Sequence, residues 1–79
     1  MLNEIEVPDV ILINFRLQIF DKDKRLNILD RYFVDKQEAI NGYEKQVELY
    51  NTMYKHVIIT LSDYNTNNIV RRYDTDDDL

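Results

Sequence analysis

The chain has 79 residues, of which 44% are hydrophobic and 32% are charged, and its formal net charge at pH 7 is −5. This length allows one domain with a single modest core, to which six tyrosines and three phenylalanines bring large side chains. The lack of cysteine excludes disulfides and thiolate metal sites, and no apolar run has the length of a membrane span. We therefore expect a cytoplasmic protein, in the host cytoplasm if it is viral, with no membrane contact.

The acidic residues are concentrated at the two ends of the chain. Residues 1–9 and 74–79 hold seven of the fifteen carboxylates and none of the ten Lys and Arg residues. The stretch 10–73 therefore has eight acids against ten bases, a net charge of about +2. We expect three parts: an N-terminal arm over residues 1–9, a single domain over 10–73 and a disordered acidic tail over 74–79.

Residues 10–20 have the alternation of a β-strand, with an apolar side chain at every second position: Ile11, Ile13, Phe15, Leu17 and Ile19. The polar stretch 21–24 contains no glycine and favours a four-residue loop. A second strand is expected over about 25–34, so that the two strands form a hairpin.

One register gives this hairpin an almost wholly apolar face. It pairs Ile19 with Leu26, Leu17 with Ile28, Ile13 with Tyr32 and Ile11 with Val34. Asp30 would lie opposite Phe15 on that face, where it needs a hydrogen-bond partner unless a nearby β-bulge relieves the conflict. The outer face would mix apolar and Arg side chains, as contact sites commonly do: Leu12, Arg16, Leu29, Arg31 and Phe33.

A helix start can be read at Asp35, whose carboxylate can accept backbone amides of the first turn. Glu38 stands three residues later, as in a capping box. An apolar stripe then recurs at spacings of three and four residues and predicts a helix through its last member: Ile40, Tyr43, Val47, Tyr50 and Tyr54. Gly42 either lets this helix approach a neighbour closely or, together with Asn41, interrupts it.

The last part of the chain predicts a second hairpin. Residues 55–63 are strongly β-forming, the Asn-rich stretch 64–68 is typical of a turn, and 69–73 return as a short strand. The order β-β-α-β-β predicts a two-layer α+β fold, in which one helix packs on a four-stranded, mainly antiparallel sheet. No sequence repeat relates the two hairpins.

Few residues of the kind that carry catalysis are present. His56 is the only histidine, and without cysteine or an evident partner we interpret it as structural or solvent-exposed. Asp21 and Asp23 begin like a calcium loop, but the glycine and the later acidic ligand of an EF-hand are missing. We therefore expect no enzymatic activity, no cofactor and no metal site.

Basic residues on both hairpins could contact phosphates, but the interleaved acids and the acidic ends argue against direct nucleic-acid binding. Two acidic groups could instead face a basic partner protein: Glu44 and Glu48 on the helix, and Asp74, Asp76, Asp77 and Asp78 in the tail. The alternative is a solvated helix surface and a tail that serves solubility.

These features predict a non-enzymatic protein-binding module, a small inhibitor or adaptor. A more specific hypothesis is a virus-type DNA mimic that acts on a nucleic-acid-handling protein, by analogy of size and acidity. The first alternative is a structural homo-oligomer, such as a homodimer, that associates through the outer hairpin face or a strand edge. A nucleic-acid-binding module ranks below both.

Overall fold

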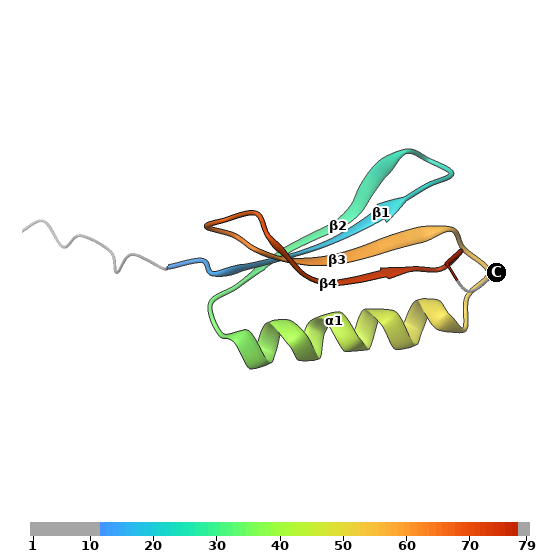
Figure 1. Cartoon of the computed structure of the whole chain (residues 1–79). Coiled ribbons are helices and arrows are strands. Elements are labelled where there is room, and N and C mark those ends of the chain that lie inside the picture. The colour runs from blue at the N-terminus through green and yellow to red at the C-terminus, as the bar shows by residue number, and fades with distance from the viewer. Residues whose placement is uncertain (1–11, 78–79) are drawn as a thin grey trace, which may run out of the picture.

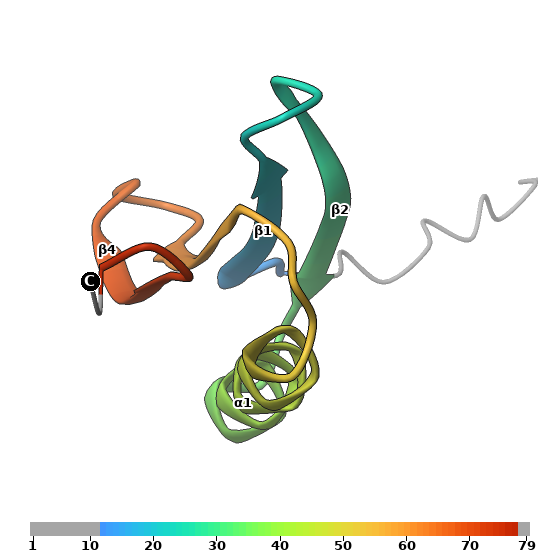
Figure 2. The same cartoon turned by 90° about the vertical axis from the view of Figure 1, so that its right-hand side faces the viewer.

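The computed structural model describes residues 12–77, so the expected arm over residues 1–9 and the start of the first strand at 10–11 lie outside it. The elements follow in the order β1 (Phe15–Asp21), β2 (Leu26–Phe33), α1 (Lys36–Asn51), β3 (Val57–Asp63) and β4 (Ile69–Asp74). The strands form one antiparallel sheet in the order β2-β1-β3-β4, and α1 lies across one of its faces (Figures 1 and 2). The predicted two-layer α+β fold is confirmed.

The core lies between α1 and the two central strands. Its fully buried side chains are Leu17 and Ile19 of β1, Val57, Ile59 and Leu61 of β3, and Ala39 of α1. β1 begins at Phe15, later than predicted, but the inward alternation expected for it is confirmed. The helix stripe packs on this cluster through its first four members: Ile40, Tyr43, Val47 and Tyr50.

The two ends of α1 differ in how well they were predicted. The N-cap at Asp35 is confirmed, because its Oδ2 accepts the backbone amide of Glu38 at 3.0 Å. The helix ends at Asn51, where the hydroxyl of Thr52 donates to the Leu49 carbonyl at 2.9 Å. Tyr54 is fully exposed beyond this end, so its predicted place in the buried stripe is wrong.

Gly42 lies in an unbroken helix and packs against Phe33 of β2. A Cβ added at Gly42 would stand 2.9 Å from Cζ of Phe33, nearer than such atoms normally come. The missing side chain therefore lets the Phe33 ring rest on the helix backbone. This decides between the two interpretations of Gly42 in favour of close packing.

The predicted register of the first hairpin is wrong. The observed pairs include Phe15–Phe33, Leu17–Arg31, Ile19–Leu29, Phe20–Asn27 and Asp21–Leu26. Ile28, between Leu29 and Asn27, has no partner on β1. It therefore forms a β-bulge that changes which β2 residues face the core. Leu29 and Phe33 pack against the core, whereas four residues expected there are exposed: Leu26, Ile28, Tyr32 and Val34.

Two carboxylates account for the observed register. Asp21, which is 7% exposed, accepts the backbone amides of Asp23 and Lys24 at 2.9 and 3.0 Å, so the turn begins at Asp21. A four-residue loop follows over residues 22–25, one residue later than the predicted 21–24. Asp30 lies on the outer face, where both of its oxygens accept hydrogen bonds from Arg16 at 2.9 and 2.7 Å. Its conflict with the core therefore does not arise.

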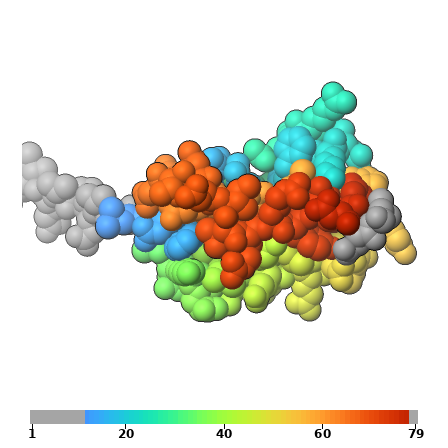
Figure 3. Space-filling view, in the orientation of Figure 1, coloured from blue at the N-terminus to red at the C-terminus, as the bar shows by residue number. Residues whose placement is uncertain are grey.

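The second hairpin runs further than predicted. Asp74 is the last residue of β4, and its Oδ1 accepts the backbone amide of Asp76 at 3.0 Å. Thr75 is bonded to Val57 through both its backbone amide and its hydroxyl. The acidic tail therefore does not begin at Asp74 as expected, while residues 78–79 lie outside the described range. Figure 3 shows β4 and the preceding turn at the surface, with the tip of the first hairpin projecting beyond the body of the domain.

Candidate functional site

The sheet face opposite α1 is covered by no element of residues 12–77 (Figure 2). The register places the alternate residues of the two central strands on it in three pairs: Arg16–Ser62, Gln18–Thr60 and Phe20–Ile58. Among the described helices, none is long and apolar enough to span a membrane. The side of the sheet that carries Arg16, which we call the open face, is therefore not covered by another element of the described chain.

Three exposed side chains and the half-buried Arg16 gather at one end of the open face, and we call these four the tyrosine patch: Arg16, Tyr32, Tyr64 and Ile69. Tyr32, Arg16, Ser62 and Ile69 form one row across all four strands, since each is the register partner of the next. Tyr64 lies in the neighbouring row, because its backbone amide donates to the Asn14 carbonyl at 2.9 Å. The exposed fractions are 46% for Tyr32, 44% for Tyr64 and 60% for Ile69.

The tyrosine patch is held in place by its own contacts. The rings of Tyr32 and Tyr64 meet edge to face, with centroids 5.6 Å apart and an interplanar angle of 85°. Cζ of Arg16 lies 5.6 Å from the Tyr32 centroid, a cation–π distance. The paired guanidinium of Arg16, by hydrogen bond and charge, lowers the pKa of Asp30 from its ordinary value. Two tyrosines from different hairpins are thus presented in a fixed geometry.

The predicted hairpin contact surface is divided between different parts of the molecule. Arg16 belongs to the open face, and Leu12, which precedes β1, is 69% exposed. Leu29 and Phe33 pack on the opposite face, against the core. Arg31 is exposed beside α1, on the same side of the sheet as Phe33. These five residues are therefore not brought together as one surface.

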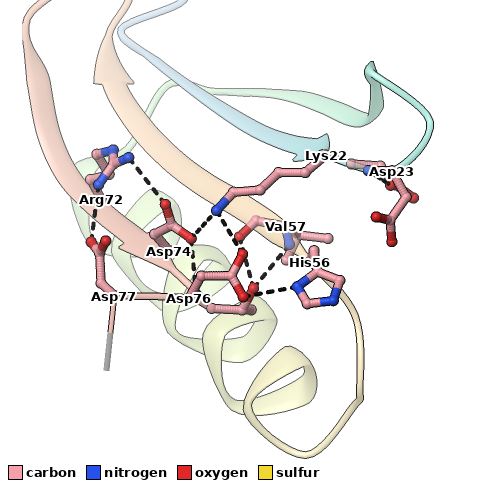
Figure 4. A network of polar contacts seen from close by, with 10 residues as sticks. Lys22, Asp23, His56, Val57, Arg72, Asp74, Asp76 and Asp77 are labelled. Carbon is pink, nitrogen blue, oxygen red and sulfur yellow. Dashed lines mark hydrogen bonds and ion pairs between the residues drawn. The ribbon is translucent and has the colours of Figure 1, made fainter. Parts of the chain in front are cut away.

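The acids predicted to face a partner are also separated. Glu44 and Glu48 are exposed on α1 and form no ion pair with any residue in the range 12–77. Three of the tail acids, by contrast, belong to a network of polar contacts at the end of β4 (Figure 4). Asp78 lies outside the described residues.

This network joins the two hairpins through Lys22 in the β1–β2 loop. The Lys22 ammonium donates to carboxylate oxygens of Asp74 and, at 2.9 Å, of Asp76. Asp76 also contacts Nδ1 of His56 at 2.8 Å. Arg72 reaches Asp74 at 3.4 Å and Asp77 at 3.3 Å. The carboxylates at the end of β4 are therefore neutralised by cations of the same chain.

The charges of this network favour its ionised form. Hydrogen bonds from Lys22 lower the pKa of Asp74 and of Asp76, to which His56 adds a second hydrogen bond. Hydrogen bonds to the same carboxylates raise the pKa of Lys22. The pKa of His56 is raised, first by its hydrogen bond to Asp76 and then by the charges of Asp76 and Asp23. The carboxylates and the cations thus favour one another's charged state, although the charge of Lys22 by itself acts to lower the pKa of His56.

His56 and Asp76 also line an open cavity of about 370 Å³ beyond the end of α1, together with Tyr50, Tyr54 and Tyr73. A carboxylate on Nδ1 of histidine is the arrangement that orients a general base. In residues 12–77, however, no hydroxyl is hydrogen-bonded to the other ring nitrogen of His56, and no group of three His, Asp or Glu side chains could hold a metal ion. The contact joins Asp76, just beyond β4, to His56.

No protein-family model, curated protein or solved structure matches this chain. The candidate site therefore rests on the geometry of the described residues.

Sequence reasoning missed three of the four residues of the tyrosine patch. Tyr32 was assigned to the core by the wrong register. Tyr64 and Ile69 were expected only as part of a turn and as the start of a short strand. The signal that could have found them is the turn chemistry: an aspartate at the start of each turn anchors the hairpin register, and with it the facing of the strand that follows.

Proposed function

We propose that this chain is a non-enzymatic protein-binding module and that the tyrosine patch is its main contact surface. The observation that carries the proposal is an uncovered sheet face on which exposed tyrosines from two hairpins and an arginine meet. Tyr and Arg are enriched among the residues that dominate binding energy at protein interfaces.

The fixed geometry of the patch supports this proposal. A side chain that is already ordered loses little conformational entropy when a partner covers it, and the paired Arg16 brings no isolated charge into the interface. Tyrosine contributes a large apolar area and a hydroxyl at the cost of only two rotatable bonds. A partner surface of mixed apolar and hydrogen-bonding groups fits this combination.

The internal ion pairs favour an aromatic contact over an acidic one. The hypothesis of a DNA mimic requires rows of carboxylates available to a basic partner, but Asp74, Asp76 and Asp77 are engaged by Lys22, His56 and Arg72. We therefore propose an inhibitor or adaptor that recognises its partner mainly through the tyrosine patch.

The proposal is tested with the double variant Tyr32→Ala/Tyr64→Ala in the full chain. Tyr54→Ala is the matched control, because Tyr54 is fully exposed and lies outside the patch. Urea unfolding first establishes that both variants fold. We expect one captured protein to bind the parent chain and the control, and to bind the double variant at least about thirtyfold more weakly, which corresponds to a loss of about 2 kcal/mol. Equal affinities for all three would contradict the proposal.

The same variants separate the other function classes. A structural homo-oligomer predicts association of the purified chain in sedimentation velocity at micromolar concentration, with loss of association in the double variant. A nucleic-acid-binding module predicts a mobility shift of single-stranded oligonucleotides at low salt. If the purified chain is a monomer and causes no mobility shift, both alternatives are excluded and protein binding is the function to test further.

A further inference from the structure

A groove runs between the edge strand β2 and the first half of α1, on the side of the sheet opposite the tyrosine patch. Its volume is about 500 Å³, and it is lined by Arg31, Phe33, Glu38, Asn41, Gly42 and Lys45. The floor is apolar, because the ring of Phe33 lies directly over the bare backbone of Gly42. The groove thus combines an aromatic base with polar walls.

The walls of the groove offer mainly hydrogen-bond donors. Neither Arg31 nor Lys45 forms an ion pair with any residue between 12 and 77. The carbonyl oxygen of the Asn41 side chain accepts from Gln37 at 3.0 Å, which leaves the amide nitrogen as a donor. Glu38 is the one acid on the wall, at the N-terminal end of α1. The two cations give the groove a charge that complements a carboxylate.

The strand beside the groove has a free edge. β2 is the outermost strand on its side of the sheet, and no other strand of the described chain pairs with its far side. The bulge at Ile28 interrupts the regular ladder, so the regular part of the edge is residues 29–33. A strand added there would place every second side chain over the groove and the others beside Tyr32.

We propose that the groove and the edge of β2 bind an acidic, extended segment of the partner protein as an additional strand. Backbone hydrogen bonds to residues 29–33 provide the pairing, and the acidic side chains of the segment face Arg31 and Lys45. This inference rests on the proposed protein-binding function and names the chemistry of the segment that is recognised. The groove lies on the opposite face of the sheet from the tyrosine patch, and the two meet only at Tyr32 on the edge strand, so different variants test them.

The experiment uses the full chain, labelled with ¹⁵N, and a short capped peptide in which glutamate alternates with valine. We expect amide shift changes concentrated in residues 29–33 and along the first half of α1, with a dissociation constant that rises with salt. A peptide in which lysine alternates with valine should bind at least about tenfold more weakly. Equal binding of the two peptides, or no shift changes at millimolar peptide, would overturn the proposal.

Charge-reversal variants test whether the peptide binds in the groove. Arg31→Glu and Lys45→Glu should each weaken binding of the glutamate peptide by about tenfold or more. Lys24→Glu is the matched control, since Lys24 is exposed in the β1–β2 loop and changes the net charge equally. Tyr64→Ala, which breaks the tyrosine patch, should leave peptide binding unchanged. If all three charge reversals weaken binding alike, the effect is one of net charge and the groove is not the site.

One further variant tests whether the N-terminal segment of this chain itself binds in the groove. Residues 4–7 of this chain, Glu4 to Val7, alternate acidic and apolar side chains in the same way as the probe. If the groove is free to bind a partner segment, peptide affinity should be the same for the parent chain and for Ile5→Ser/Val7→Ser, which keeps the net charge. A gain of peptide affinity in that variant would make the chain's own N-terminal segment the occupant and would overturn the assignment to a partner.

Discussion

The two hairpins of the sheet are built around the same turn. In each, an aspartate at the end of the first strand accepts two backbone amides: Asp21 from Asp23 and Lys24, and Asp63 from Asn65 and Thr66. The residue four positions after each aspartate has a left-handed backbone conformation: Arg25 with φ 56° and Asn67 with φ 62°. Each hairpin also has a register shift at the same distance from its aspartate. It lies next to Ile19 in the first hairpin and next to Leu61 in the second. The two hairpins therefore repeat at an interval of 42 residues, from Asp21 to Asp63.

Beyond the turns the hairpins diverge. The first carries Arg16, Asp30 and Tyr32 on the open face, and its outer strand borders the groove beside α1. The second ends in a turn that Lys22 and His56 hold in place. Of the turn positions compared above, only the aspartate is the same residue in both. A backbone repeat can thus persist with almost no sequence repeat, because a few positions with a local hydrogen-bonding role determine the turn.

The largest effects are expected where the two hairpins share the core. Leu17 and Ile59 occupy equivalent positions and are 1% and 0% exposed. Leu17→Ala and Ile59→Ala should each reduce the free energy of unfolding by about 2–5 kcal/mol, the cost of a buried cavity. Leu26→Ala should cost less than about 1 kcal/mol, because Leu26 is half-exposed in the observed register. Urea denaturation distinguishes these outcomes, and a large loss at Leu26 would restore the register predicted from the sequence.

The next effect tests whether the two turn aspartates are equivalent. Asp21→Ala should cost about 2–3 kcal/mol, since it leaves two amides without their charged acceptor at a buried position. Asp63→Ala should cost about 1–2 kcal/mol, because Asp63 is more exposed and water can replace part of its hydrogen bonding. Thermal unfolding of both variants measures the difference. If the Asp63 variant is the less stable of the two, burial is not what separates the hairpins.

A smaller effect is expected at the left-handed residues. Arg25→Gly should stabilise the chain by about 0.5 kcal/mol, because glycine adopts positive φ without a steric penalty and this gain exceeds its added freedom in the unfolded state. Asn67→Gly should change stability by about zero, since asparagine already tolerates this conformation. Chemical denaturation of the pair compares the two turns directly. A loss of stability at Arg25 would mean that its side chain contributes more than its strained backbone costs.

The smallest effect concerns the ion pairs that hold the second hairpin, which are partly exposed and screened by water. Asp76 raises the pKa of His56 in the folded chain above the ordinary value of 6.5. The stabilisation that the His56–Asp76 contact provides is therefore complete below the pKa of His56 in the unfolded chain. It is lost as the pH rises through the pKa of His56 in the folded chain. We expect the free energy of unfolding to fall as the pH rises above the ordinary histidine pKa of 6.5. In His56→Gln this dependence of the free energy of unfolding on pH should disappear, because His56 is the only histidine. If the dependence is retained in the variant, a group other than His56 causes it.

Much of the fold could be predicted because its signals are local. The alternation of β1, the Asp35 cap and the stripe from Ile40 to Tyr50 each depend on neighbours within one element. The helix end could not be predicted from the stripe, because Thr52 stops the helix while Tyr54 still fits the spacing. The spacing of apolar residues does not reveal that a hydroxyl can bind a backbone carbonyl of the last turn and so end the helix.

The candidate site could not be predicted because it depends on a single extra residue. The bulge at Ile28 reverses which side chains of β2 face outward, and this moves Tyr32 onto the open face and Phe33 into the core. Nothing in the alternation of residues 26–33 distinguishes this arrangement from a regular strand. The contact between Tyr32 and Tyr64 adds a long-range pairing that depends on both hairpin registers at once.

The most direct test of the tyrosine patch replaces single tyrosines with a photo-crosslinking analogue, p-benzoylphenylalanine, in the full chain. Position 32 and position 64 lie in the patch, and position 54 is equally aromatic but lies outside it. Irradiation in the native cell should give the same protein adduct from Tyr32→p-benzoylphenylalanine and Tyr64→p-benzoylphenylalanine, with no such adduct from Tyr54→p-benzoylphenylalanine. An adduct formed at position 54 alone, or adducts of equal yield at all three positions, would contradict the assignment of binding to the open face of the sheet.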